Sequence, residues 1–221
     1  MSAPSPWRDA ARKHLESRLR AGLAALSPGT GFPVDALLHY LWLLDRWNRA
    51  YNLTAVREPA DMIAVHLLDS LSILPYVQPP SLLDVGSGAG LPGLPVALAR
   101  PDLQVTLLDS NGKKTRFLKQ ACMELGATNI EVVRTRVQDY RPSTPFSTIV
   151  SRAYGRLDSF VRQVLHLCAR DGVILAMKAR FGESAETDDL PAGLSLDVLP
   201  LNVPDLDARR TLVRVRPGHG I

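Results

Sequence analysis

The chain has 221 residues, of which 46% are hydrophobic and 22% are charged. These fractions are close to the averages for soluble globular proteins, so they exclude a disordered tail or a fibrous repeat, and the length suits one to one and a half domains. The net charge is +4, and 21 of the 26 basic residues are arginine. Arginine pairs with phosphate through a planar two-donor fork, so a polyanionic partner is one explanation of this bias. A genomic preference for arginine codons on an ordinary surface is the other.

Cysteine usage and hydropathy bear on the cellular environment. Cys122 and Cys168 lie far apart with no second cysteine or paired histidine nearby, so the sequence predicts neither a disulfide framework nor a zinc site. Both are expected to be buried helix residues. The N-terminus lacks the pattern of a signal peptide, and no run approaches the roughly 20 apolar residues that span a bilayer. We expect a soluble cytoplasmic protein that acts as a monomer, with no bound metal and no membrane contact.

Helices are predicted for the first 80 residues. Leucines recur at helical spacing over residues 15–26, and apolar residues do so again over 37–51. A third helix should begin at Pro59, where the missing N–H of proline costs nothing, and should end before Pro75. Residues 1–80 are therefore expected to form a helical N-terminal cap.

From Ser81 onward, short apolar runs alternate with helical stretches, which is typical of βαβ units around a parallel sheet. Two late runs have no long helix between them and should close the sheet as an antiparallel pair. Residues 81–221 are thus expected to form one α/β domain with a mostly parallel seven-stranded sheet. The predicted strands are Leu82–Val85, Val105–Leu108, Ile130–Val133, Thr148–Ser151, Val173–Met177, Leu194–Leu199 and Thr211–Arg216, with helices at 92–100, 112–125 and 156–169.

The most informative segment is a glycine-rich turn, Asp84-Val-Gly-Ser-Gly-Ala-Gly-Leu-Pro-Gly93. A buried strand leads into three glycines at alternate positions, and a helix begins near Pro92. Glycine lets the backbone approach a ligand closely, and a helix N-terminus offers free N–H groups to negative charge. The segment therefore predicts a nucleotide-binding turn.

The frame of the glycines decides which nucleotide is favoured. Counted from Gly88, the run fits the G-x-G-x-x-G fingerprint of dinucleotide-binding proteins. However, the first glycine after the strand is Gly86, a carboxylate at Asp84 lies in the strand, and Leu91 stands where a frame from Gly86 needs its third glycine. Acid-x-Gly-x-Gly-x-Gly instead resembles motif I of the S-adenosylmethionine-dependent methyltransferases, in which the acid works near the cationic amino end of the methionine moiety. The cofactor predicted for Asp84, Gly86 and Gly88 is S-adenosylmethionine.

Residues after the second and third predicted strands extend this cofactor site. Asp109 ends the second strand, where a carboxylate accepts hydrogen bonds from ribose hydroxyls. NAD-binding proteins do the same, and a cap or turn role is the alternative for each acid. The segment 134–139 follows the third strand, where adenine would lie, so Gln138 or Asp139 is a candidate for its amino group. A solvated polar loop is the alternative there.

The methyl acceptor is inferred from the end of the fourth strand. Methyl transfer from a sulfonium is an in-line displacement, so orientation supplies much of the acceleration without a catalytic side chain. The chain has Ser151-Arg152-Ala153-Tyr154 in place of the Asn/Asp-Pro-Pro-Tyr element of exocyclic-amine methyltransferases. Neither cysteine follows the proline or threonine that marks the nucleophile of cytosine C5 transfer. Both of these acceptor classes are disfavoured.

Several motifs together resemble one family. Asn52-Leu-Thr54, His66-Leu-Leu-Asp69-Ser70, the 84–93 turn and Ser151-Arg152-Ala153 are similar to segments of the bacterial glucose-inhibited division protein B family, over about residues 35–180. Members methylate guanine N7 in 16S ribosomal RNA of the small subunit. Two positions depart from the family, Val65 where a basic residue is frequent and Ala179 where glycine is common. The resemblance implies S-adenosylmethionine contacts at Gly86, Leu91, Val137, Gln138 and Arg152, with Asp109 toward the ribose.

The implied chemistry needs positioning more than proton transfer. Guanine N7 carries an in-plane lone pair and no proton, so no general base is required and no residue is expected to be catalytic in that sense. Arg152 is a positioning candidate at the cofactor carboxylate or an RNA phosphate, because contact with guanine N7 would block it; a surface ion pair is the alternative. His66 shares a helical face with Asp69 and Ser70. That face either closes over the cofactor or base, or is a structural hydrogen-bond cluster.

The expected partner is small-subunit ribosomal RNA, free or within the 30S particle. The candidate phosphate contacts are basic residues near the N-terminus and in the helix after Asp109. Two other functions stay open: a methyltransferase with a small-molecule acceptor, for which the chain lacks an obvious insertion, and a dinucleotide-binding redox or sensor protein. The candidate RNA-binding residues are Arg8, Arg12, Lys13, Arg18, Arg20, Lys113, Lys114 and Arg116.

Overall fold

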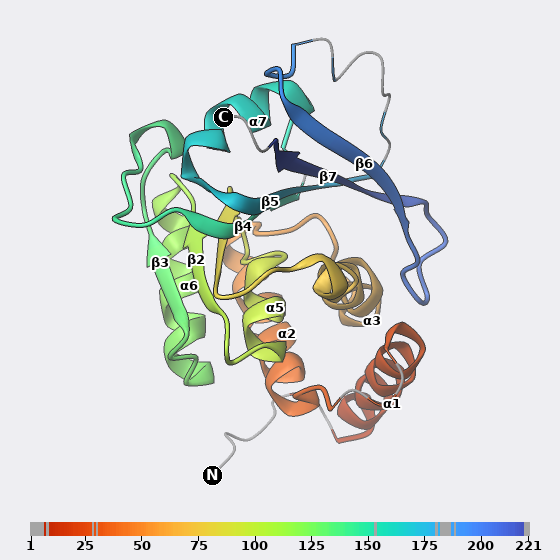
Figure 1. Cartoon of the computed structure of the whole chain (residues 1–221). Coiled ribbons are helices and arrows are strands. Elements are labelled where there is room, and N and C mark those ends of the chain that lie inside the picture. Colours follow the sequence, from red (N-terminus) through yellow and green to blue (C-terminus); the bar gives the residue numbers. More distant parts are fainter. Residues whose placement is uncertain are drawn as a thin grey trace.

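A seven-stranded sheet runs through the centre of the molecule in the order β3-β2-β1-β4-β5-β7-β6 (Figure 1). The computed structural model describes residues 7, 9–27, 29, 31–152, 154–179, 181, 187 and 189–218. The strands β1 to β5 are parallel, and β7 lies antiparallel between β5 and β6. The mostly parallel α/β sheet expected from the sequence is confirmed. Its strands are β1 (Ser81–Val85), β2 (Gln104–Leu108), β3 (Ile130–Val133), β4 (Phe146–Arg152), β5 (Cys168–Lys178), β6 (Leu194–Leu201) and β7 (Arg210–Pro217).

The strand order reverses between β1 and β4, which pair in parallel through Leu82 and Thr148. In open α/β sheets, ligands bind at such a switch point, outside the carboxyl ends of the strands. Because β7 runs antiparallel, its first residues meet the carboxyl end of β5 at the same edge, where Lys178 pairs with Thr211. The carboxyl ends of β1, β4 and β5 and the start of β7 can therefore contribute side chains to one region beside the switch point.

Helices cover both faces of the sheet (Figure 1). On one face lies α7 (Leu157–Val164). On the other lie α5 (Gly93–Ala99) and α6 (Gly112–Leu125), followed outward by α1 (Asp9–Leu26) and α2 (Val34–Tyr51). The side chain of Asn111 caps α6 by accepting the N–H groups of Lys113 and Lys114. Short 3-10 turns occupy Leu74–Tyr76, Val137–Asp139 and Leu165–Leu167.

The third predicted helix is not a regular α-helix. It is divided into α3 (Pro59–Met62), a π-helical segment (Ile63–Leu68) and α4 (Asp69–Leu71). The N–H of Asp69 reaches the carbonyl of Ala64, five residues back. Apolar spacing does not distinguish such a turn from an α-helix, which is why the sequence missed it. Within α-helices, π-turns are rare and frequently lie at functional sites.

The helix predicted over residues 156–169 is too long. Helix α7 ends at Val164 and β5 begins at Cys168, so the expectation that Cys168 is a helix residue is wrong. Cys122 does lie in α6, and both cysteines are half-buried rather than fully buried. The error has a physical cause, because a short apolar run around residue 167 fits either a helix or a buried strand.

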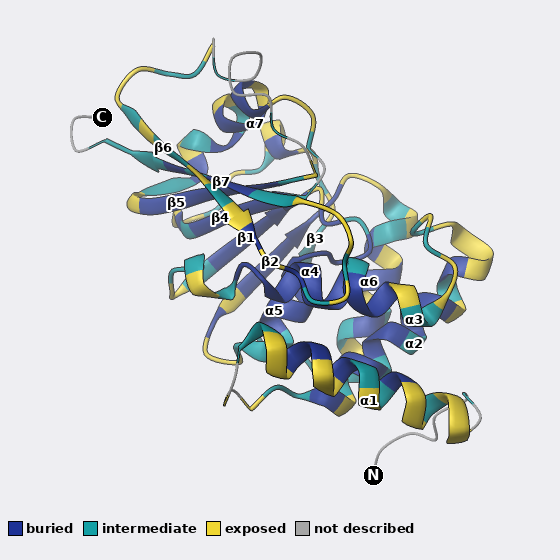
Figure 2. Ribbon diagram, turned by 90° about the vertical axis from the view of Figure 1, so that its right-hand side faces the viewer, coloured by how far each residue is buried: buried dark blue, intermediate teal, exposed yellow. Residues whose placement is uncertain are grey.

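Two hydrophobic clusters fill the spaces between the layers. One lies between the sheet and α7. The other continues without interruption from the N-terminal helices to the sheet and includes Leu19, Leu41, Leu67, Leu94 and Leu212. Figure 2 shows buried residues along the inward surfaces of α2, α4 and α5, and an exposed outer face on α1. The N-terminal helical region thus shares its core with the sheet. In the described part of the chain, no helix has the length and hydropathy needed to cross a bilayer.

Candidate functional site

The glycine-rich turn joins β1 to α5, and two of its glycines are required for opposite reasons. Gly86 has φ +69° and open space around the position of a side chain. At Gly93, by contrast, a Cβ would lie 2.8 Å from the Asp84 carboxylate, so only glycine fits. The turn therefore presents bare backbone on its outer side while packing tightly on its inner side.

Asp84 supports this turn from below. Its side chain is fully buried, and Oδ2 accepts the backbone N–H of Gly93 at 2.8 Å. Burial raises the pKa of Asp84 to about 7, while the Gly93 hydrogen bond opposes that rise. The second oxygen, Oδ1, has no hydrogen-bond partner among the described residues. Asp84 thus has a structural role at Gly93 and one oxygen that is not engaged.

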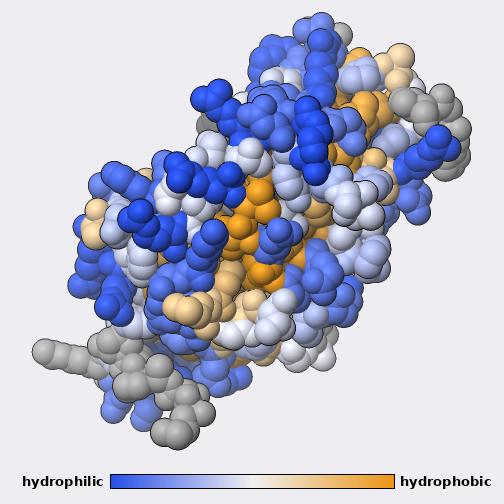
Figure 3. Space-filling view, turned by 90° about the vertical axis from the view of Figure 1, so that its left-hand side faces the viewer, coloured by the Kyte–Doolittle hydropathy of each residue, from blue (hydrophilic) through white to orange (hydrophobic). Residues whose placement is uncertain are grey.

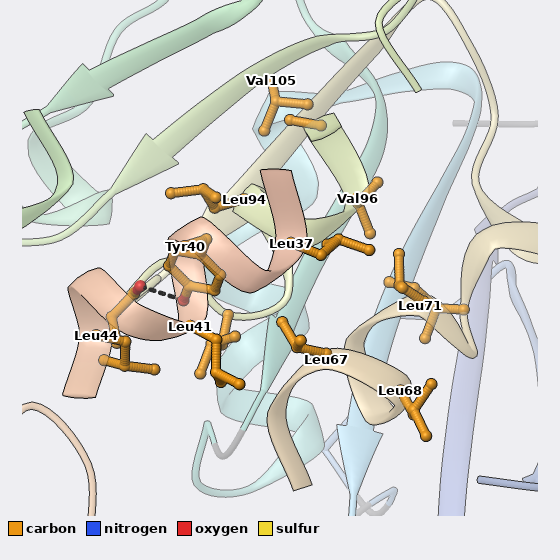
Figure 4. Close-up of a cluster of buried hydrophobic side chains, with 14 of the residues drawn as sticks. Leu37, Tyr40, Leu41, Leu44, Leu67, Leu68, Leu71, Leu94, Val96 and Val105 are labelled. Carbon is orange, nitrogen blue, oxygen red and sulfur yellow. Dashed lines mark hydrogen bonds between the residues drawn. The ribbon is translucent and has the colours of Figure 1, made fainter. Parts of the chain in front are cut away.

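Tyr40 holds the turn from the side of the N-terminal helices. Its hydroxyl donates a 2.7 Å hydrogen bond from α2 to the carbonyl oxygen of Ala89 (Figure 4). The ring is fully buried among leucines of α2 and the π-helical segment, and this burial raises the pKa of the phenol far above its usual value. This contact could not be predicted from the sequence, because Tyr40 occupies an ordinary apolar position of the helix.

A cavity of about 160 Å³, here called cavity A, opens beside the turn at the carboxyl ends of β1, β2 and β3. Four predicted cofactor residues line it: Gly86, Asp109, Val137 and Gln138. The structure therefore brings together residues that are far apart in the sequence. The complete lining is Val85, Gly86, Leu108, Asp109, Ser110, Thr135, Arg136, Val137, Gln138 and Tyr154.

Asp109 is the buried acid of cavity A. Its Oδ2 accepts the N–H of Gly88 at 2.9 Å, and its Oδ1 accepts the N–H of Asn111 at 2.8 Å. The ammonium of Lys114 lies 4.0 Å from Oδ2. A carboxylate has about four lone-pair sites, so these contacts fix its orientation and leave acceptor capacity toward the cavity.

Gln138 and Tyr154 reach cavity A from different elements and are tied together through Gln163 on α7. Gln138 donates its amide to Gln163 Oε1, which also accepts the hydroxyl of Tyr154 at 2.7 Å. The Tyr154 ring packs against Phe160, with ring centroids 4.9 Å apart. One wall of the cavity is therefore built from amide groups and an aromatic ring.

A second cavity of about 340 Å³, here called cavity B, lies at the carboxyl ends of β4 and β5 and at the start of β7. The π-helical segment covers it. Both positioning candidates, His66 and Arg152, line this cavity rather than cavity A. The complete lining is Val65, His66, Asp69, Arg152, Met177, Lys178, Ala179 and Arg210.

Asp69 links two guanidinium groups in cavity B. Its side chain is 2% exposed, with Oδ2 3.2 Å from Nη1 of Arg152 and Oδ1 3.0 Å from Nε of Arg210. Nη1 of Arg152 also donates to the carbonyl of Val65 in the π-helical segment, at 2.9 Å. The end of β4, the start of β7 and the π-helical segment are thus fixed to one another by charge-assisted hydrogen bonds.

His66 is 3% exposed and has one engaged ring nitrogen. Nε2 lies 2.8 Å from the hydroxyl of Thr54, while Nδ1 has no hydrogen-bond partner among the described residues. Burial and the nearby charge of Arg152 lower the pKa of His66 to about 4, while the backbone of Val65 opposes that fall, so the ring is neutral near pH 7. The predicted shared face holds for His66 and Asp69, but Ser70 is fully buried and does not line the cavity.

Three predicted cofactor residues line neither cavity. Asp84 and Gly88 act on the turn through hydrogen bonds, and Leu91 is buried beneath it. The sequence reasoning missed several lining residues that follow strand ends, and strand position would have been a usable signal for them. Arg210 gave no such signal, because it lies at the beginning of an antiparallel strand. The missed residues are Ser110, Thr135, Arg136 and Tyr154 in cavity A, and Met177, Lys178 and Arg210 in cavity B.

The predicted RNA-binding residues fall into two groups. On α1, carboxylates pair with Arg12, Arg18 and Arg20, while Lys13 is exposed and has no ion pair among the described residues. Arg8 lies outside the described residues. On α6, Lys113 and Arg116 are exposed and have no ion pair within the described part of the chain. The face on the left of Figure 1, which carries β3 and α6, has hydrophilic side chains around a narrow hydrophobic strip (Figure 3).

The strand order and the glycine-rich turn at the switch point have the Rossmann-like fold of the class I methyltransferases. Among solved structures, coclaurine N-methyltransferase bound to N-methylheliamine and SAH superimposes with a TM-score of 0.52 at 12% identity, over 86% of this chain and 66% of that one. In the described residues, no group of three or more His, Cys, Asp or Glu side chains is placed to hold a metal ion.

Sequence relatives give a narrower assignment. The family model for rRNA small subunit methyltransferase G, GidB, matches residues 34–213, so the chain belongs to this family. The ribosomal RNA small subunit methyltransferase G of Alkalilimnicola ehrlichii is 55% identical over 180 residues, 81% of each chain. The protein of the same name from Laribacter hongkongensis is 49% identical over 91% of this chain and 98% of its own. The family expected from the motifs is confirmed.

Proposed function

We propose that this protein transfers a methyl group from S-adenosylmethionine to N7 of a guanine in small-subunit (16S) ribosomal RNA. The observation that carries the proposal is the pair of cavities on the two sides of the β1–β4 switch point. Residues predicted from the sequence to bind the cofactor line these cavities, and the chain belongs to a methyltransferase family. The names of the relatives support the RNA substrate. The family resemblance of the motifs implies N7 as the acceptor atom.

Cavity A suits the adenosine portion of the cofactor. The bare backbone at Gly86 permits close approach, and Asp109 has acceptor capacity for ribose hydroxyls. Val137 and Gln138 would contact the adenine, with the Tyr154 ring beside them. When bound, S-adenosylmethionine supplies a methyl group activated by its sulfonium charge.

The methionine portion of the cofactor would extend toward the switch point. Arg152 ends β4 there, and its guanidinium, which also contacts Asp69, would bind the cofactor carboxylate. Leu91 and Asp84 lie under the turn, where Asp84 sets its shape through Gly93. Gly88 contributes by holding Asp109 in place.

The residues of this chain would contribute to the reaction by orienting the cofactor and the guanine. N7 of guanine has a lone pair and no proton, so attack needs no base. The lowered pKa of His66, about 4, makes its imidazole a weak base, which is consistent with a binding role and not a proton-transfer role. The two arginines bridged by Asp69 hold the walls of cavity B in a fixed geometry. Proximity and orientation are sufficient to supply most of the rate acceleration of such a displacement.

The proposal also covers the role of the N-terminal helices, the surface that RNA approaches and the oligomeric state. Residues 1–80 would act as a cap fixed to the catalytic domain of residues 81–221, because Tyr40 and Asp69 bind elements of that domain. RNA would approach over α6, where Lys113 and Arg116 carry unneutralised charge, more than over α1. The protein would act as a cytoplasmic monomer on free small-subunit RNA or on the 30S particle.

The decisive experiment is transfer of a labelled methyl group to small-subunit RNA, free and in 30S particles, from a strain lacking the enzyme. The modified base is then mapped. Label on N7 of one guanine is expected, and no label on any guanine would contradict the proposal. Calorimetric binding of S-adenosylhomocysteine but not NAD(H) would separately eliminate a dinucleotide-binding protein.

A further inference from the structure

We propose that cavity B receives the acceptor nucleotide and that Nδ1 of His66 hydrogen-bonds it. The proposal rests on the function proposed above and adds a specific contact to it. His66 would then be a binding residue for the acceptor in addition to its contact with Thr54.

The position of cavity B relative to cavity A is the first argument. Cavity A lies at β1, β2 and β3, on one side of the switch point, and cavity B lies at β4, β5 and β7, on the other. Lys178, which lines cavity B, donates a hydrogen bond to the backbone carbonyl of Tyr154, and Tyr154 lines cavity A. The two cavities are therefore separated only by the end of β4 and the turn after it. A cofactor held in cavity A would present its methyl group toward cavity B.

The unpartnered nitrogen is the second argument. Buried polar atoms nearly always have a hydrogen-bond partner, so an exception needs an explanation. Nδ1 of His66 is such an exception, and its residue lines cavity B. The other ring nitrogen is held by Thr54 at 2.8 Å, so the ring has a fixed orientation. A ligand in the cavity would give Nδ1 the missing partner.

The chemistry of the lining is the third argument. Among the described lining residues, the two guanidinium groups of Arg152 and Arg210 share the single carboxylate of Asp69, and they lie beside a neutral imidazole. A nucleotide combines an anionic phosphate with a base that carries hydrogen-bonding edges, and it matches this lining. The volume of about 340 Å³ also lies within the range of small-molecule sites, which begins near 300 Å³.

Two substitutions separate the roles of the two ring nitrogens. In His66→Gln, the amide lies near the position of Nε2, so the Thr54 contact can persist while the group at Nδ1 is lost. In His66→Asn, the shorter amide lies near the position of Nδ1, so the cavity keeps a hydrogen-bonding group while the Thr54 contact is lost. Each variant is assayed for methyl transfer to 30S particles lacking the modification, for S-adenosylhomocysteine affinity and for melting temperature.

We expect His66→Gln to lower kcat/KM for the RNA at least tenfold, with S-adenosylhomocysteine affinity within twofold of wild type. His66→Asn, which keeps a hydrogen-bonding group toward the cavity, should lose less kcat/KM than His66→Gln and should melt at a lower temperature than wild type. Unchanged kcat/KM in His66→Gln, or an equal loss of affinity for S-adenosylhomocysteine, would overturn the assignment. If His66→Asn does not fold, the folded His66→Gln variant still decides. Wild-type enzyme that labels no guanine would instead contradict the proposed function itself.

Discussion

Removing the Tyr40 hydroxyl tests whether the N-terminal helices set the geometry of the cofactor turn. The Tyr40→Phe substitution keeps the buried ring and deletes only the 2.7 Å hydrogen bond to Ala89. Ala89 is 4% exposed, so its carbonyl would lose a partner that water does not easily replace. A buried group left unsatisfied costs about 1–3 kcal/mol, and the free energy of unfolding should fall by that amount. About 1.4 kcal/mol is a factor of ten in affinity. If about 0.7–1.4 kcal/mol of this loss is expressed in the geometry of the turn, S-adenosylhomocysteine should bind about three- to tenfold more weakly.

A matched control distinguishes a local effect on the turn from general destabilisation. Thr148 also has a fully buried hydroxyl, which bonds the backbone of Gln78 near the opposite end of the sheet. Thr148→Val should therefore lower stability by a similar amount, measured by urea unfolding, and leave calorimetric affinity for S-adenosylhomocysteine unchanged. If Tyr40→Phe lowers stability but binds S-adenosylhomocysteine as wild type does, the coupling between α2 and the turn is refuted.

Three other outcomes follow from the site. Asp109→Asn should weaken S-adenosylhomocysteine binding by about ten- to a hundredfold in calorimetry, because hydrogen bonds to a charged group contribute about 1.5–3 kcal/mol; wild-type affinity would exclude a ribose contact. Lys113→Gln with Arg116→Gln should reduce the salt dependence of RNA binding by about 0.7–0.9 in log–log slope per lost phosphate contact, whereas Arg12→Gln, whose charge is already paired with a carboxylate, should not; equal slopes in the two would disprove the α6 surface. His66 has a pKa of about 4 when folded and about 6.5 when unfolded, so the unfolded chain gains the proton first as pH falls. Wild type should thus lose about 2 kcal/mol more stability than His66→Gln between pH 7 and pH 5, and parallel urea-unfolding curves would argue against a neutral buried ring.

The sheet and part of the lining of cavity A could be predicted from sequence patterns within short segments of the chain. The alternation of strands and helices, and the glycines after β1, depend on residues near one another in the chain, so the sequence could predict that Gly86 and Asp109 lie in one region. Cavity B could not be assembled in this way. It requires the π-turn and the antiparallel entry of Arg210, neither of which changes the apolar spacing. Tyr40 was missed for a related reason, because a buried hydroxyl that reaches a distant carbonyl has the same periodicity as a leucine.

The shared core has a consequence for how the protein is made. The N-terminal helices leave the ribosome first, yet their apolar faces pack in one cluster with Leu212 of β7. The ion pair between Asp69 and Arg210 likewise joins residues 141 positions apart. Domains generally fold as units during synthesis, and this unit is incomplete until β7 has emerged. The nascent chain therefore carries an uncovered leucine-rich surface until β7 has been translated, and stable folding requires that strand.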